Sequence, residues 1–191
     1  TYFFFSHTYK KQPYNRDLLR AILDKKIRLI DYEVLTDEKG RRLIGFGRYA
    51  GIVGAYNALL AAGKKFKRYE LKPAHECEDR KEVERELKKM DLPNGFKTVI
   101  TGKGRVAGGA MEILASAGIR KVTPKAFLEE RFSEPVYAQL GVEHYNKTKD
   151  GSQFSKSEFY EFPERFDSDF ARYAEAADMY ISCHYWDADA P

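Results

Sequence analysis

A glycine-rich turn is the feature of this sequence most suited to chemistry. Gly102, Gly104 and Gly108 follow one another with the spacing G-x-G-x-x-x-G. A β-rich run at 97–101 precedes them and an apolar run at 110–117 follows. Glycines let a backbone approach a pyrophosphate closely, and the next helix offers free N–H groups and its positive dipole end. Because the spacing departs from G-x-G-x-x-G, the context carries the interpretation, and a plain strand-to-helix turn is the alternative.

The position expected to bind the ribose of a dinucleotide lies about 20 residues after such a turn, at the end of the second strand. Thr123 stands there, with Lys121 and Lys125 nearby. A carboxylate at this place would repel a 2′-phosphate, and none is present. The sequence therefore leaves both NAD and NADP open as cofactors.

Histidines and cysteines offer further candidates. His7 follows the aromatic run 2–5, and an imidazole suits proton transfer because it titrates near neutral pH. The alternative is a histidine held by structural hydrogen bonds at the end of a strand. His75 and Cys77 form an H-x-C pair without two further ligands at suitable spacing, so we expect a surface loop and no metal. Cys183 lies in an apolar run and is expected to be buried.

The elements that position these groups follow from hydrophobic periodicity. For the first half, the sequence predicts a buried strand at 2–5, a helix at 16–25, a β-rich segment at 27–35, a turn at 36–40, a hairpin strand at 42–46, a helix at 49–62 ended by Gly63, a linker at 64–77 and a charged helix at 78–90. The break at 91–95 is predicted to separate a substrate-side domain, residues 1–91, from a Rossmann-like half, residues 92–191.

The second half has the strand, glycine turn, helix and strand of a parallel α/β sheet. The sequence predicts strands at 97–101 and 120–123, a helix at 110–117, a helix beginning at Thr123 and Pro124, loops and short helices at 129–166, a helix at 169–177 and a strand at 179–184. The fold class is therefore α/β, with a partial Rossmann-like sheet joined to part of a second α/β domain.

Composition excludes several classes of protein. The chain has 191 residues, 43% of them hydrophobic, and a net charge of +4 that is spread among interleaved acids and bases. We expect no nucleic-acid binding, no membrane span and no signal peptide, and with two cysteines a cytoplasmic location is the simplest expectation. The absence of an initiator Met leads us to expect a natural start upstream.

Several ordered motifs resemble the saccharopine dehydrogenases and lysine–ketoglutarate reductases. Residues 4–12 are similar to the family's F-x-H-x-x-K-x-Q stretch, and residues 29–33, residues 40–51, the glycine turn and residues 180–186 continue the resemblance in order. A broader relation extends to alanine dehydrogenase and transhydrogenase. The resemblance implies a nicotinamide-dependent oxidoreductase of lysine metabolism, acting on saccharopine or on lysine and 2-oxoglutarate.

The same resemblance implies roles for individual residues. His7 would be the general acid/base, with Lys10 and Glu33 as charged residues near the reaction centre. Arg42 would clamp a substrate carboxylate, and Gln12 and Phe46 would contact substrate. The cofactor positions would be Arg41, Gly102, Gly104, Arg105, Val106, Gly108, Thr123 and Tyr185. The family's catalytic lysine precedes the His motif and lies outside this chain, so activity of the isolated chain is not implied.

Other interpretations of these residues stay open. Arg41 and Arg42 could be exposed charges after a turn, Tyr185 a packing residue, and Glu33 with Lys10 a surface ion pair worth about 0–1 kcal/mol. Two other functions compete with the family's own: another amino-acid dehydrogenase of the alanine dehydrogenase superfamily, and a non-catalytic nucleotide-binding module. The sequence leaves the reaction direction and the oligomeric state undetermined.

Overall fold

The computed structural model describes residues 1–185 and divides the chain into two compact units, Thr1–Phe46 and Gly47–Pro191. Each unit is described by itself. The predicted boundary near residue 91 concerns domains of the whole protein and stays a prediction. Within this chain the contacts divide between Phe46 and Gly47 instead, because the long helix that begins at Gly47 packs on the later part of the chain.

The first unit has two short parallel strands joined through a helix. Its elements are β1 (Tyr2–Phe4), the 3-10 turn η1 (Pro13–Asn15), α1 (Arg16–Asp24), β2 (Leu29–Asp31) and the 3-10 turn η2 (Tyr32–Val34). The predicted helix at 16–25 is confirmed. The prediction of a buried first strand is wrong, because Tyr2 and Phe3 are 59% and 60% exposed.

The segment after β2 does not form the predicted hairpin. Gly40 has the positive φ, +73°, that the turn was predicted to need. A single antiparallel bridge joins Thr36 to Arg42, and residues 42–46 form no strand. The β-rich run at 27–35 is likewise a strand only over β2, since its second half turns into η2.

The second unit is built on a four-stranded parallel sheet. Its elements are α2 (Gly47–Phe66), η3 (Ala74–Glu76), α3 (Arg80–Leu87), β3 (Lys97–Thr101), α4 (Arg105–Ser116), β4 (Arg120–Val122), α5 (Pro124–Glu129), β5 (Val136–Leu140), α6 (Val142–Tyr145), β6 (Asn146–Thr148), α7 (Lys156–Glu161), η4 (Pro163–Arg165), β7 (Phe166–Ser168), α8 (Ala171–Ala176) and β8 (Met179–Ser182). The strand order is β4-β5-β3-β8, and all three pairings are parallel. The predicted Rossmann-like α/β class is confirmed.

One strand of this sheet was not predicted. β5 lies between β3 and β4, in a region predicted to hold only loops and short helices. It is a run of five residues, four of them buried. Its β-propensity is strong, but the flanking polar and aromatic residues hid it. The helix after the glycine turn therefore leads from β3 to the edge strand β4, two positions away in the sheet.

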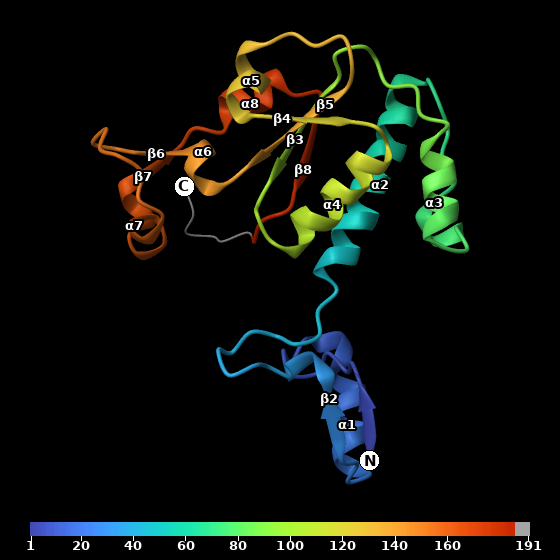
Figure 1. The fold of residues 1–191 in the computed structure, drawn as a ribbon. Helices are drawn as coiled ribbons and strands as arrows, with labels where there is room; N and C mark the ends of the chain where they lie inside the picture. Colours follow the sequence, from blue (N-terminus) through green and yellow to red (C-terminus); the bar gives the residue numbers. More distant parts are fainter. Residues whose placement is uncertain (186–191) are drawn as a thin grey trace. The chain divides into compact units, whose positions relative to one another are not determined.

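Alternate residues of the strands face two separate cores. Ile100 of β3 packs in the cluster formed with α2 and α4, whereas Val99 packs in the cluster that includes Phe127 of α5 and Tyr173 of α8. This alternation follows from the period of two along a strand. Figure 1 shows α2 and α4 on one face of the sheet and α5 and α8 on the other. Such covered faces are typical of parallel sheets.

The crossing of α2 and α4 is close because glycines stand where the helices meet. A Cβ atom on Gly51 would lie 1.9 Å from the carbonyl oxygen of Val106, and one on Gly109 would lie 1.9 Å from that of Arg48. The prediction that small residues permit close packing is thus confirmed. The prediction that Gly63 ends α2 is wrong, because the helix continues to Phe66. Gly63 is instead buried against Tyr69, whose ring would meet a Cβ at 2.6 Å.

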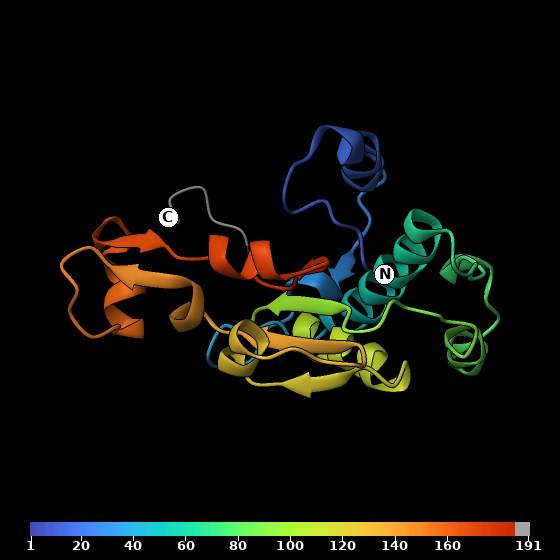
Figure 2. The ribbon, with the colours of Figure 1, turned by 90° about the horizontal axis from the view of Figure 1, so that it is seen from above.

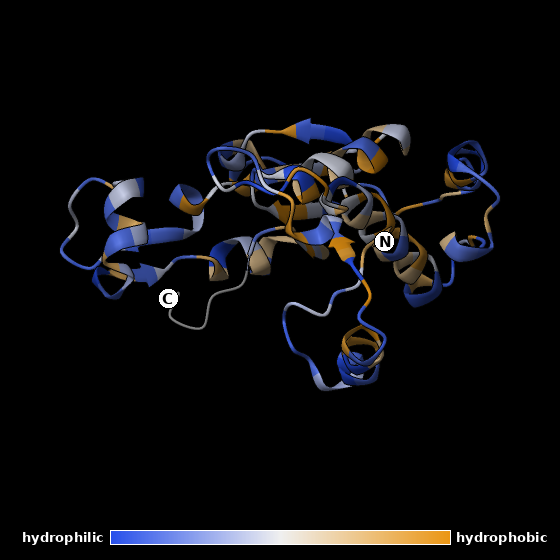
Figure 3. Cartoon of the chain, turned by 90° about the horizontal axis from the view of Figure 1, so that it is seen from below, coloured by the Kyte–Doolittle hydropathy of each residue, from blue (hydrophilic) through white to orange (hydrophobic). Residues whose placement is uncertain are grey.

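Residues 146–168 project from one end of the sheet as a small antiparallel pair, β6 and β7, with α7 (Figure 2). This extension is mostly hydrophilic, in contrast with the strands at the centre of the unit (Figure 3). Within residues 1–185, no helix combines the length and the apolar character that crossing a membrane requires.

Candidate functional site

The glycine turn begins directly where β3 ends. Gly102 has φ +98°, and a Cβ atom there would lie 2.5 Å from the carbonyl oxygen of Cys183, just after β8. Only glycine meets both requirements. Gln139 of β5 holds the turn from the other side, since its side-chain amide donates a 2.9 Å hydrogen bond to the carbonyl oxygen of Gly102. The turn is therefore fixed by both strands that neighbour β3.

Gly104 faces open space at the start of α4. It is the N-cap of the helix, and a Cβ atom added to it would meet nothing within 4 Å. The first N–H groups of a helix have no partner within the helix, so those of Arg105 and the next residues point toward this space. A phosphate pair fits such a place, because its charge faces free donors and no side chain of the turn obstructs it.

A hollow of about 220 Å³ adjoins the turn at the carboxyl ends of the central strands. It is lined by Gly102, Lys103, Gly104, Gly141, Val142, Glu143, Tyr145, Lys156, Tyr160, Cys183, His184 and Tyr185. In open parallel sheets, ligands bind outside the carboxyl ends of the strands. This hollow is the candidate dinucleotide site.

An ion pair spans the hollow's edge. Nζ of Lys103, in the glycine turn, donates a hydrogen bond to the carboxylate of Glu143, which follows β5. Burial alone would raise the pKa of Glu143, but the hydrogen bond and charge of Lys103 outweigh it and hold that pKa below its usual value. Glu143 is therefore ionised at neutral pH.

His184 forms the opposite wall together with the end of β3. Its Nδ1 lies 2.6 Å from Oγ1 of Thr101, which is also 3.0 Å from the hydroxyl of Tyr180. Burial lowers the pKa of His184 below its ordinary value. The imidazole is thus neutral at physiological pH. Burial likewise raises the pKa of the Cys183 thiol to about 11, in keeping with the small buried residue that was predicted.

The sequence did not single out Lys103, Gln139, Gly141, Glu143 or His184 for this site. The missing signal was β5, because a strand ending at Leu140 and followed by glycine marks another loop at the ligand-binding edge. Thr123, the residue we expected at the ribose, instead caps α5 by accepting a 3.1 Å hydrogen bond from the amide of Ala126. Its strand, β4, is one position too far from β3 for that role.

The other predicted cofactor residues of this unit differ in what they offer. Gly108 lies inside α4, with open space around its Cα. Arg105 is exposed at the first position of α4, whereas the side chain of Val106 packs against the core, which leaves only its backbone N–H for a ligand. Tyr185 lines the hollow and is 88% exposed, so core packing does not explain it. Trp186, the last residue of the same motif, lies outside the described residues.

A histidine–glutamate pair is the centre of the first unit. Nδ1 of His7 lies 2.8 Å from Oε2 and 2.9 Å from Oε1 of Glu33, a side chain that is only 1% exposed. His7 has φ +55°, a left-handed conformation that a non-glycine residue adopts at a cost of about 1–3 kcal/mol. Asn15 holds this backbone with a 2.8 Å hydrogen bond to the carbonyl oxygen of His7. Such strain is typical of functional positions.

Asp31 organises the backbone around this pair. Its carboxylate accepts a 2.5 Å hydrogen bond from the hydroxyl of Ser6 and a 2.9 Å bond from the amide of Glu33. Burial would raise the pKa of Asp31, but these donors outweigh it and keep the pKa below its usual value. One ionised carboxylate therefore positions both the residue before His7 and its partner Glu33.

Comparison with known proteins covers the whole chain. It is 32% identical to alpha-aminoadipic semialdehyde synthase, mitochondrial, of Rattus norvegicus and 28% identical to that synthase of Arabidopsis thaliana, with 100% of the chain matched in each case. Over 60% of its length it is 32% identical to saccharopine dehydrogenase [NAD(+), L-lysine-forming] of Candida glabrata. The chain is a relative of the saccharopine dehydrogenases. The resemblance predicted from the motifs is confirmed.

The chain spans only part of these relatives. It matches 23% of the rat synthase, 21% of the Arabidopsis synthase and 34% of the Candida saccharopine dehydrogenase. No family model matches the chain. Roles that the saccharopine dehydrogenase resemblance implies can now be compared with where the structure places each side chain.

Arg42 is brought to the predicted centre and Lys10 is not. The guanidinium of Arg42 lies 3.7 Å from Oε1 of Glu33, and its side chain remains 39% exposed and able to bind an anion. Lys10 is exposed, with Nζ 6.0 Å from the ring centroid of Tyr9. Among the described residues no ion pair joins Lys10 to Glu33, so the predicted surface pair between them is wrong. Arg41 is 74% exposed and pairs with Asp37 at 2.8 Å within the turn.

The two predicted substrate-contacting residues, Gln12 and Phe46, lie on opposite sides of the aromatic stack around His7. The ring of Phe5 stacks on His7 at 5.4 Å and meets Phe46 edge-on at 5.7 Å. Gln12 accepts a 2.5 Å hydrogen bond from the hydroxyl of Tyr14, whose ring lies 6.5 Å from His7. Phe46 is 52% exposed, so both residues are available to a ligand.

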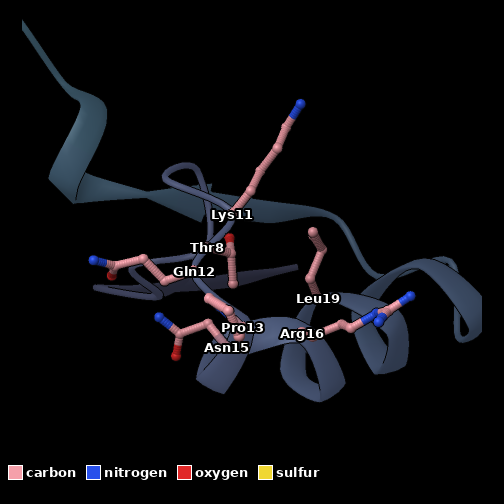
Figure 4. A pocket seen from close by; sticks show the side chains of 7 residues that line it. All are labelled: Thr8, Lys11, Gln12, Pro13, Asn15, Arg16 and Leu19. Atoms are coloured by element: carbon pink, nitrogen blue, oxygen red, sulfur yellow. The ribbon is translucent and has the colours of Figure 1, made fainter.

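A hollow of about 330 Å³ lies beside Gln12, lined by Thr8, Lys11, Gln12, Pro13, Asn15, Arg16 and Leu19. Figure 4 shows the side chains of Lys11, Gln12 and Arg16 pointing in different directions. They do not converge on one point. No group of three His, Cys, Asp or Glu side chains within residues 1–185 could hold a metal ion.

Proposed function

We propose that this chain forms part of a nicotinamide-dependent oxidoreductase acting at the secondary amine or imine that links lysine and 2-oxoglutarate. The observation that carries the proposal is the open glycine turn at the carboxyl end of β3, with Gly104 facing free space and the first amides of α4 beside it. The names of the relatives, which include an NAD(+)-linked saccharopine dehydrogenase, support the same reaction class.

The glycine turn supplies the cofactor site in this proposal. The amides at the start of α4 bind the pyrophosphate, and the hollow lined by Tyr145 and Tyr185 receives the adenosine half. A nicotinamide dinucleotide, when bound, supplies or accepts the hydride. Gln139 and the contact of Gly102 with Cys183 keep the turn rigid, so that binding does not require the backbone to be ordered first.

His7 is the proposed general acid/base. Its Nδ1 donates to Glu33, which leaves Nε2 to exchange a proton with the nitrogen or oxygen of the substrate. Oxidation of a secondary amine removes a hydride from carbon and a proton from nitrogen, and hydrolysis of the resulting imine moves further protons. Glu33 stabilises the imidazolium after His7 takes a proton and fixes the ring orientation throughout.

Arg42 is the proposed carboxylate clamp for the substrate. A guanidinium binds carboxylates with two parallel hydrogen bonds, and the side chain of Arg42 is exposed enough to do so while its charge balances Glu33. Gln12 and Phe46 are the proposed polar and apolar substrate contacts. Saccharopine, or lysine and 2-oxoglutarate, provide the carboxylates and amino groups that this set of side chains would recognise.

The proposal is tested in two steps. Calorimetry with NADH and NADPH on the 191-residue chain is expected to show binding of at least one nucleotide, and absence of both would overturn the proposal. Turnover is then measured in the protein that contains this chain, with saccharopine, lysine plus 2-oxoglutarate, alanine and pyruvate as substrates. Turnover of alanine or pyruvate alone would identify a different amino-acid dehydrogenase.

The His7→Ala variant separates an enzyme from a non-catalytic nucleotide-binding module. It is expected to bind nucleotide like the wild type and to lose turnover, because the glycine turn is untouched. Turnover equal to the wild type would reject His7 as the acid/base. A cytoplasmic location also stays a prediction, to be tested by cell fractionation, since the name of the rat relative includes the word mitochondrial.

A further inference from the structure

We propose that Glu143 makes the dinucleotide site selective for NAD over NADP. This inference rests on the proposed cofactor site and assigns its specificity. It also changes what the sequence suggested, because the sequence placed no carboxylate at the ribose position. The carboxylate is present, but it follows a strand that the periodicity did not reveal.

The topology of the sheet places Glu143 at the ribose position. The ribose ligand of a dinucleotide fold comes from the end of the strand that pairs with the first strand. β5 is that strand, since it pairs with β3 in parallel from Lys97↔Val136 to Thr101↔Leu140. Glu143 follows β5 directly and lines the same hollow as Gly102 and Gly104.

Lys103 fixes where the carboxylate lies. It comes from within the glycine turn, 40 residues before Glu143 in the chain, and donates to the carboxylate across the hollow's edge. Gly141 leaves the room that this contact needs, because a Cβ atom there would lie 2.4 Å from Oε2 of Glu143 and 2.5 Å from Cε of Lys103. The pair therefore occupies a defined place beside the phosphate-binding turn.

The charge of Glu143 discriminates between the two cofactors. A carboxylate accepts hydrogen bonds from the free 2′-hydroxyl of NAD. The 2′-phosphate of NADP carries a charge of about −1.5 to −2 and cannot donate in the same way. Lys103 does not reverse this preference, because its charge is already matched by Glu143.

Lys156 is the rival determinant in the same hollow. Its ammonium lies 5.8 Å from the ring centroid of Tyr160 and would attract a 2′-phosphate. It belongs to α7 in the projecting extension, whereas Glu143 is bonded to the glycine turn itself. Proximity to the turn therefore favours Glu143 as the deciding charge.

The test compares dissociation constants for NADH and NADPH, measured by calorimetry on the full 191-residue chain and its variants. The wild type is expected to bind NADH about tenfold or more tightly than NADPH, since like-charge contacts cost several kcal/mol. Glu143→Gln is expected to weaken NADH binding and strengthen NADPH binding. Glu175→Gln, an exposed glutamate on α8, is the matched control and is expected to change neither.

Each outcome has a distinct meaning. If the wild type binds neither nucleotide, the proposed cofactor site fails. If it binds NADPH as tightly as NADH or more tightly, the site stands and the role of Glu143 is overturned. If Lys156→Met, and not Glu143→Gln, changes the preference, Lys156 is the determinant and this inference is wrong. Because the wild-type ratio alone can overturn the inference, it remains testable even if Glu143→Gln fails to fold, which circular dichroism would reveal.

Discussion

Nδ1 of His7 lies 2.8 Å from Oε2 of Glu33, and the pair joins a strained residue to a buried one. A buried carboxylate is costly unless it is paired. Here the imidazole, the guanidinium of Arg42 and the backbone organised by Asp31 all face Glu33. The left-handed backbone of His7 is therefore held by contacts that it would lose if Glu33 lost its charge.

The Glu33→Gln substitution is expected to lower kcat by about a hundredfold or more, because the uncharged amide no longer stabilises the imidazolium. KM is expected to change little, and the pH profile of kcat/KM is expected to lose its wild-type shape. Kinetics on the protein that contains this chain measure both. Glu38→Gln, an exposed glutamate in the nearby turn, is the control. A wild-type pH profile in Glu33→Gln, with only a lower melting temperature, would assign Glu33 a purely structural role.

Added methyl groups at the crossing of α2 and α4 are expected to destabilise the second unit. Gly51→Ala and Gly109→Ala would each place a Cβ atom 1.9 Å from a backbone oxygen, and overpacking of this kind costs about 1–3 kcal/mol or more. Urea denaturation measures the loss. Gly54→Ala in the same helix meets nothing within 4 Å and is expected to stabilise by roughly 0.5–1 kcal/mol. Equal effects at Gly51 and Gly54 would contradict the close crossing.

Filling the space above the glycine turn is expected to abolish nucleotide binding without unfolding the chain. Gly104 has φ −91° and open surroundings, so Gly104→Val fits the backbone but places a side chain where the phosphates would lie. Gly118→Ala is a control for glycine replacement outside the site, at a helix end with φ +73°. Calorimetry and thermal unfolding of both variants give the comparison. Unchanged affinity in Gly104→Val would show that the phosphates bind elsewhere.

The stability of the second unit is expected to fall in mild acid because of His184. Burial lowers the pKa of His184 below 6.5 in the folded chain. Above pH 6.5 the imidazole is neutral in both states and contributes no pH dependence. As the pH falls through 6.5, the unfolded chain takes up a proton that the folded chain resists, so the free energy of unfolding decreases until the pH passes the folded pKa.

The His184→Gln variant isolates this effect, because glutamine does not titrate. The difference in unfolding free energy between wild type and variant is expected to change between pH 8 and pH 5. Urea denaturation at both values measures it. A difference that is the same at both pH values would show that His184 is not protected from protonation.

The elements predicted from the sequence were those whose signals are local. The helix at 16–25, the glycine turn, and the cap formed by Thr123 and Pro124 depend on neighbouring residues, and the structure has all of them. Gly63 and the hairpin were wrong because tertiary contacts decide them: Gly63 is needed for its contact with Tyr69, and residues 42–46 have no strand to pair with.

The candidate site shows the same division. His7, Glu33 and the glycine turn could be predicted, because a motif or a spacing marks each of them. Glu143 could not, because its place depends on the order of strands in the sheet, and a short buried strand such as β5 has no helical or alternating pattern to reveal it. One missed strand was enough to shift the expected ribose position from Glu143 to Thr123.

The strand order β4-β5-β3-β8 also sets a timetable for synthesis on the ribosome. When β3 and β4 have emerged, they are two strands that are not partners of each other, with apolar side chains and unsatisfied backbone groups on both. Sheet formation waits for Val136–Leu140, which must insert between them. A nascent chain stalled before residue 136 would therefore expose two lone strands, and it is at this stage that aggregation or chaperone capture is expected to be greatest.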